Sequence, residues 1–308
     1  MKAVVIRRFG GPEVLEVADL PVPEPGPGEV RIRVAAATVN PTDIGLRSGA
    51  YGAVPLPAIP GMELAGTVDA VGAGVTTCHA GDRVMAIVQP RRPEGGAQAE
   101  LVVVPADSVA PIPSGASLTE AATLPMNGLT VRRALDLLQL PAGATLAITG
   151  AAGAVGGYAI QLGKVEGLRI VADAAPADVA LVRGLGADIV VARGQAVAAA
   201  IRAAVPGGVD ALLDAAVQGA AVLPAVRDGG QIAAVRRFEG GSERGIRIHQ
   251  VGVTDYLRNH AALAALGQLA GAGRLTLRVT ATFPPEQVGE AHRRLQAGGV
   301  RGRMLIVF

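Results

Sequence analysis

The chain has 308 residues, of which half are hydrophobic and only 2% are aromatic, and its 28 basic and 26 acidic side chains leave a formal net charge of +2. This length is sufficient for two domains with separate cores, and the near-even charge argues against a protein that binds nucleic acid or a membrane surface. One cysteine excludes an internal disulfide, and neither a signal peptide nor an apolar membrane-spanning stretch is visible, so we expect a soluble, cytoplasmic protein.

Residues 1–120 predict a β-rich domain. Short apolar runs alternate with clusters of Pro, Gly and Asp, which is the pattern of a small irregular barrel rather than of strand–helix–strand units. The four prolines within residues 21–30 predict a loop that leads into a strand. The expected strands are Val4–Ile6, Val30–Val34, Gly66–Val71, Arg83–Val88 and Leu101–Val104.

The pattern changes near residue 117. Ser117 and Glu120 form the signature of a capping box, and a second helix is expected at 128–138. Strands and helices then alternate, which predicts a parallel sheet covered by helices on both faces. The expected strands are 145–148, 169–172, 189–191 and 211–213, with further strands at 231–234, 246–251 and 302–308; the helices are 155–164, 176–185, 195–205, 220–225 and 259–271.

A glycine-rich turn, GAAGAVG at residues 150–156, joins the first strand and helix of this alternation. In the dinucleotide-binding fingerprint G-x-G-x-x-G, Gly153 and Gly156 take the second and third glycine positions, and an alanine replaces the first. Gly153 would let the backbone approach a pyrophosphate at the helix N-terminus, and Gly156 would let the helix pack closely on the strand. Gly150, Ala154 and Val155 complete the expected binding turn. The alternative is a tight turn without a ligand.

Asp173 lies 20 residues after Gly153, where an acidic side chain binds the ribose hydroxyls of NAD. Asp178 adds a second negative charge, and no Lys or Arg stands between Asp173 and Arg183. The sequence therefore favours NAD(H) over NADP(H). The alternative role of Asp173 is a helix N-cap, and the two roles do not exclude each other.

Several motifs in order give the chain a family resemblance. They are VNPTDIGLRSG at 39–49, IPGMELAGTV at 59–68, GDRV at 81–84, GGAQAE at 95–100, ATLPMNGLT at 122–130, the glycine turn, and GVRGR at 299–303. Together they span nearly the whole chain and resemble the medium-chain dehydrogenase/reductase superfamily, in its zinc-free quinone oxidoreductase-like branch.

This resemblance implies an α/β protein with two domains. A GroES-like irregular β-barrel catalytic domain would comprise residues 1–122 and 261–308, and a doubly wound Rossmann domain that binds the cofactor would comprise residues 123–260. Members are commonly homodimers joined through an edge of the Rossmann sheet, with the cofactor in the cleft. They transfer hydride from a reduced nicotinamide cofactor to a quinone or to an activated C=C bond. Alternatives are an enoyl or acryloyl thioester reductase, an enoyl reductase of secondary metabolism, and a non-catalytic, crystallin-like protein that only binds cofactor.

The residues at the matching positions bear on metal and cofactor. Met62 stands where zinc-dependent relatives have a histidine ligand, and one cysteine cannot form a four-cysteine site, so we expect no zinc. NADP-dependent relatives usually have Ser, Lys and Tyr at the positions held here by Ala175, Asp178 and Ala192. Their absence supports the expected preference for NAD(H).

Three further residues are candidates for the site. The resemblance places Thr130 beside the nicotinamide, with helix capping as the alternative. Asn40 and Asp43 match a polar pair on the cleft floor, although Pro41 makes a structural turn equally compatible with the sequence. Tyr51 matches a proton-donating tyrosine of enoyl reductases, and a phenol can protonate a developing enolate. Tyr51 could instead line the pocket without donating a proton.

Overall fold

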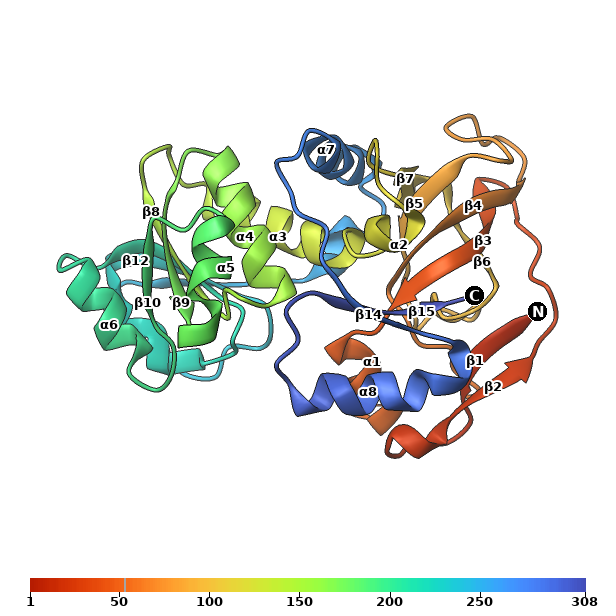
Figure 1. Ribbon diagram of the computed structural model, residues 1–308, viewed down its shortest axis with the longest axis horizontal. Helices are drawn as coiled ribbons and strands as arrows, with labels where there is room; N and C mark the ends of the chain where they lie inside the picture. The colour runs from red at the N-terminus through yellow and green to blue at the C-terminus, as the bar shows by residue number, and fades with distance from the viewer. Residues whose placement is uncertain (53) are drawn as a thin grey trace. The chain divides into compact units, whose positions relative to one another are not determined.

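The computed structural model describes residues 1–52 and 54–308, which divide into two compact units (Figure 1). Unit 1 comprises Met1–Met126, Leu257–Ala272 and Leu277–Phe308, and unit 2 comprises Asn127–Tyr256 and Gly273–Thr276. Among these residues we find no helix that is both long and apolar enough to cross a bilayer.

Unit 1 is built on a largely antiparallel sheet with the strand order β14-β15-β3-β4-β5-β7, and β6 pairs with β3 beside this path. A separate antiparallel ribbon consists of β1 (Lys2–Ile6) and β2 (Leu15–Asp19). The sheet strands are β3 (Glu29–Thr38), β4 (Glu63–Val71), β5 (Arg83–Ile87), β6 (Leu101–Pro105), β7 (Val109–Pro111), β14 (Val279–Phe283) and β15 (Arg303–Val307). Because β15 pairs with β3, the end of the chain returns to the sheet formed by its beginning.

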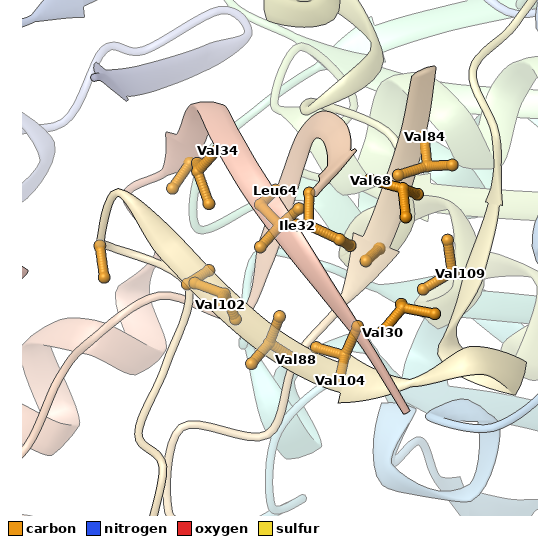
Figure 2. Packing of buried hydrophobic residues seen from close by; sticks show 14 of the residues in the cluster. Val30, Ile32, Val34, Leu64, Val68, Val84, Val88, Val102, Val104 and Val109 are labelled. Carbon is orange, nitrogen blue, oxygen red and sulfur yellow. The ribbon is translucent and has the colours of Figure 1, made fainter. Parts of the chain in front are cut away.

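Aliphatic side chains fill the core of this sheet, as the low aromatic content predicts. Alternate residues of each strand point to the same face, so side chains from β3, β4 and β6 meet in one cluster. Figure 2 shows this packing of Val30, Ile32, Val34, Leu64, Val68, Val84, Val88, Val102, Val104 and Val109.

The helices of unit 1 are α1 (Pro41–Ser48), α2 (Leu118–Ala121), α7 (His260–Gly271) and α8 (Val288–Ala297). The predicted capping box of Ser117 and Glu120 is confirmed at the start of α2. Sequence reasoning missed α1, α8, β2, β7 and β14. Asn40 and Pro41 were compatible with a turn, yet Asn40 is the N-cap and forms a capping box with Asp43 that begins a helix there.

Unit 2 contains a parallel sheet with the strand order β10-β9-β8-β11-β12-β13, which confirms the predicted doubly wound fold. Its strands are β8 (Thr145–Thr149), β9 (Arg169–Ala174), β10 (Ile189–Ala192), β11 (Val209–Asp214), β12 (Val226–Ala234) and β13 (Arg247–Gln250). Its helices are α3 (Pro125–Leu138, whose first two residues belong to unit 1), α4 (Ala154–Val165), α5 (Val179–Gly184) and α6 (Val197–Ala204).

Two of the expected helices in unit 2 take a tighter form. The segment predicted as a helix over 176–185 starts with a 3-10 turn at Pro176–Asp178 before α5, and residues Gly219–Ala225 form a 3-10 helix. The strand order reverses between β8 and β11, which in doubly wound sheets is where a crevice for ligands opens at the carboxyl ends of the strands.

Candidate functional site

The glycine turn lies at the carboxyl end of β8, at this reversal point. Gly153 is the N-cap of α4 and supplies no side chain to cap the helix. The first N–H groups of a helix have no acceptor within the helix, so this terminus presents donors and a partial positive charge. A Cβ on Gly156 would stand 2.4 Å from the carbonyl oxygen of Gly150, whereas one on Gly153 would stand 3.1 Å from that atom. These contacts fit a turn that packs its helix tightly at Gly156, and the approach of a pyrophosphate at Gly153 stays a prediction.

Two buried aspartates hold the backbone around this turn. Asp173, near the end of β9, accepts a hydrogen bond from the Ala151 N–H at 2.9 Å. Asp214, the last residue of β11, accepts from the Thr149 hydroxyl at 2.8 Å and from the N–H groups of Gln218 and Gly219 at 2.8 and 3.0 Å. The strands on either side of β8 therefore each anchor a loop of the site. Sequence reasoning missed Asp214, although an Asp at the end of an apolar run before a Gly-containing loop was the available signal.

Asp173 is only 4% exposed and lies within β9. The alternative of a helix N-cap is therefore wrong, since Ala175 and Asp178 occupy the cap positions that follow. Asp178 is buried as well. The hydrogen bond from Ala151 engages one oxygen of Asp173 with the turn. Contact of Asp173 with a ribose stays a prediction.

The backbone of an exposed arginine lies beside the end of β9. Arg193 follows β10, and its backbone N–H donates to the carbonyl oxygen of Ala174 at 3.1 Å. This places Arg193 next to the last residue of β9 and close to Ala175, where doubly wound folds bind the adenosine ribose. Sequence reasoning missed Arg193 because it follows a different strand, and only the parallel pairing of β10 with β9 brings it to this position.

The remaining predicted residues are distributed over both units. Thr130 lies in the second turn of α3 and is largely buried, so capping of the helix N-terminus is excluded as its role. Tyr51 lies in the loop after α1 with 44% of its surface exposed. Its ring packs against the helix at Gly45, where a Cβ would meet the ring at 2.6 Å. The position of Tyr51 leaves both of its predicted roles open.

Asn40 belongs to a buried polar network in unit 1. Its amide nitrogen donates to the Thr38 hydroxyl at 2.9 Å, and its amide oxygen accepts from Arg303 at 2.6 Å. Arg303 also donates to the carboxylate of Glu63, whose other oxygen accepts from the Met126 N–H at 2.7 Å. Because Asn40 has no exposed surface, the structure gives it the structural role; direct contact with a cofactor stays a prediction.

Asp43 completes this network at the start of α1. Its two oxygens accept from the N–H groups of Asn40 and Gly61 at 2.8 and 2.9 Å. Complete burial raises the pKa of Asp43 to about 7, because removal from water disfavours the charged form more than the two N–H donors and Arg303 favour it. Residues of the motifs at 39–49 and 59–68 thus form a buried hydrogen-bond network within unit 1.

Met62 is 6% exposed beside this network. Among residues 1–52 and 54–308 there is no group of three or more His, Cys, Asp and Glu side chains arranged to hold a metal ion. The expectation of no zinc stays a prediction that metal analysis tests.

Comparison with known proteins adds to this geometry. Residues 26–114 match the family described as "Alcohol dehydrogenase GroES-like domain", and residues 185–306 match "Zinc-binding dehydrogenase". A solved structure described as an NAD-dependent alcohol dehydrogenase is 31% identical, is covered over 100% of both chains, and superposes with a TM-score of 0.89. The chain belongs to the medium-chain dehydrogenase/reductase superfamily.

Other members of the superfamily carry more specific names. A chloroplastic NADPH-dependent alkenal/one oxidoreductase of Arabidopsis thaliana is 35% identical over 62% of this chain and 52% of its own length. A quinone oxidoreductase of Pseudomonas aeruginosa is 38% identical over 55% and 51%. The chain thus spans about half the length of the first curated relatives that it matches. A mycobacterial protein solved with NADPH is 27% identical over the full length of both chains, with a TM-score of 0.87.

Proposed function

We propose that this protein transfers hydride from a reduced nicotinamide dinucleotide to a quinone or to the activated C=C bond of an enone. The observation that carries this proposal is the glycine turn at the strand-order reversal, anchored by Asp173 and Asp214 on its two sides. The names of the superfamily members support the acceptor class, since they include alkenal/one and quinone oxidoreductases.

The dinucleotide would supply the hydride, so the protein mainly binds, orients and excludes water. The N–H groups at the start of α4 would hold the pyrophosphate, and Gly153 would allow its close approach. Thr130 would lie beside the nicotinamide. Tyr51 would donate the proton that an enone needs at its α-carbon. A quinone that has accepted hydride can take its proton from water instead.

The choice between NADH and NADPH follows from charges near the end of β9. The predicted preference for NADH rested on Asp173 and Asp178 facing a 2′-phosphate, but both side chains are buried and Asp173 is bonded to the turn. Arg193 is exposed and its backbone N–H bonds to Ala174, so its guanidinium would suit a 2′-phosphate bound there. The geometry therefore does not support a preference for NADH. We expect NADPH to serve as a cofactor as well.

The experiment is a panel assay with the purified protein. NADPH and NADH are each incubated with a quinone, an enone and a saturated ketone, and loss of the reduced-nicotinamide absorbance is followed. Turnover with the quinone or enone but not with the ketone is expected. Dinucleotide binding by calorimetry without turnover of any acceptor would instead favour the non-catalytic alternative.

Two further parts of the proposal concern the cell and the assembly. We propose a cytoplasmic homodimer joined through an edge strand of the unit 2 sheet, where β10 and β13 lie at the two edges. Light scattering after size-exclusion chromatography tests the dimer, and a monomer at micromolar concentration would contradict it.

A further inference from the structure

A glycine lies within α1, directly beside the ring of Tyr51. Glycine is among the least favourable residues inside a helix, because its backbone loses the most conformational freedom there. The helix itself is firmly anchored in unit 1, since the buried Arg47 donates to the carbonyl oxygen of Gly10 at 2.6 Å and to the side chain of Gln296 at 3.1 Å. Helix stability therefore does not explain Gly45, whereas its contact with Tyr51 does.

The phenol end of Tyr51 fills the space where a side chain of residue 45 would lie. A Cβ built on Gly45 would stand 2.6 Å from Cζ, 2.8 Å from Cε2 and 2.8 Å from the hydroxyl oxygen of Tyr51. Carbon atoms in favourable contact lie about 3.5–4.0 Å apart. No side chain at residue 45 is therefore compatible with this position of the ring. The ring packs against α1 while 44% of the Tyr51 surface remains exposed.

The loop that carries Tyr51 is bonded to the same part of α1. The Ala50 N–H donates to the carbonyl oxygen of Gly45 at 2.9 Å, and the Gly52 N–H donates to the carbonyl oxygen of Gly49 at 3.1 Å. The backbone on both sides of Tyr51 is thus connected to the end of α1. With the backbone fixed in this way, the absence of a side chain on Gly45 determines how closely the hydroxyl approaches the helix.

We propose that Gly45 is a positioning residue that sets the place of the Tyr51 hydroxyl for proton transfer. The inference rests on the proposed function, in which Tyr51 protonates an enone. Reduction of an enone adds hydride from the dinucleotide at the β-carbon, and the electron pair of the C=C bond moves toward the carbonyl oxygen. The α-carbon of the resulting enolate then takes the hydroxyl proton of Tyr51, and water returns a proton to the phenolate. Because a quinone can take its proton from water, only the enone reaction depends on this position.

The test is Gly45→Ala, in which the new methyl group displaces the phenol from α1. The protein should still fold, because the half-exposed ring can turn toward solvent and alanine favours the helix. The kcat values for an enone and for a quinone are measured in the same sample, so that their ratio does not depend on the fraction of active protein. The enone-to-quinone ratio should fall about tenfold, less than the roughly 10²–10⁴-fold contribution of a positioned proton donor, since the hydroxyl is moved and not removed.

Two further variants separate positioning from a structural effect. Gly184→Ala is the control, because Gly184 ends α5 and a Cβ there would meet no atom within 4 Å, so the ratio should stay at its wild-type value. Tyr51→Phe should lower the ratio about 10²-fold or more. Adding Gly45→Ala to Tyr51→Phe should cause no further fall, because no hydroxyl remains to be displaced. A full tenfold fall in that background, or an unchanged ratio in Gly45→Ala alone, would overturn the inference.

Nitration of tyrosine supplies a readout that does not depend on turnover. Tetranitromethane modifies accessible phenol rings, and peptide mass spectrometry measures Tyr51 and Tyr256 separately in one digest. Nitration of Tyr51 relative to Tyr256 should rise in Gly45→Ala and stay constant in Gly184→Ala, and no rise would overturn the inference. Absence of hydride transfer to every acceptor would contradict the proposed function, while nitration would still decide whether Gly45 sets the position of the ring.

Discussion

Gly153 and Gly156 belong to one turn, but the structure predicts different consequences for adding a methyl group to each. In Gly156→Ala the new Cβ would stand 2.4 Å from the Gly150 oxygen and 2.6 Å from the Ala151 Cα. Both are backbone atoms that cannot rotate away, so α4 must move from β8. Overpacking of this kind costs about 1–3 kcal/mol of the free energy of unfolding.

In Gly153→Ala the Cβ would stand 3.1 Å from the same oxygen, which a small shift relieves. The backbone at Gly153 has φ −70° and ψ 178°, values that any residue adopts. A Gly→Ala change at such a position also restricts the unfolded chain, which adds roughly 0.4–1 kcal/mol of stability. We therefore expect the free energy of unfolding to change by less than about 1 kcal/mol.

Dinucleotide binding should be weakened more by Gly153→Ala than by Gly156→Ala. The methyl group of Gly153→Ala occupies the space through which a pyrophosphate approaches the N-terminus of α4, so the dissociation constant for NADPH should rise about tenfold or more, equal to about 1.4 kcal/mol. Urea unfolding measures the stability of both variants, and calorimetry measures dinucleotide affinity. Unchanged affinity in Gly153→Ala would refute the assignment of the turn as the pyrophosphate site. Wild-type stability in Gly156→Ala would refute the close packing of α4.

Four other changes test separate parts of the structure. Arg193→Ala should weaken NADPH about tenfold and leave NADH unchanged in calorimetry, with Arg183→Ala as control; equal loss for both would contradict a 2′-phosphate contact. Activity should survive EDTA, and metal analysis should find far less than one zinc per chain, whereas stoichiometric zinc would place the chain in the zinc-dependent branch. Glu63→Gln should lower the free energy of unfolding in urea by about 3–5 kcal/mol, since it removes the one carboxylate that the buried Arg303 pairs with directly in the described residues; a loss under about 1 kcal/mol would show that the pair contributes little. Burial, with Arg47 adding to it, lowers the pKa of His292 to about 3, so between about pH 7 and pH 5 the unfolded ring takes up a proton that the folded ring does not; wild type should therefore lose about 2 kcal/mol relative to His292→Leu over this range, a difference from which the titration of Asp43 cancels because both proteins contain it.

The order of elements in unit 2 and the place of the glycine turn are readable from the sequence. Strand–helix alternation and the spacing of Gly153 and Gly156 depend on residues close together in the chain, and local backbone preferences carry that information. The capping box at Ser117 is local in the same way. The motifs that are spread over the whole chain carry the family resemblance, and this resemblance predicted the barrel of unit 1.

Only the tertiary structure decided what the charged residues do. Asp173 stands at the expected distance from the turn, but its burial and its bond to Ala151 depend on how β9 packs beside β8. Arg193 reaches the end of β9 through the pairing of two strands, and Arg303 meets Glu63 across most of the length of the chain. Periodicity reports which face of an element is apolar; it carries no information on which distant side chain will face a given charge, because that depends on the register between strands.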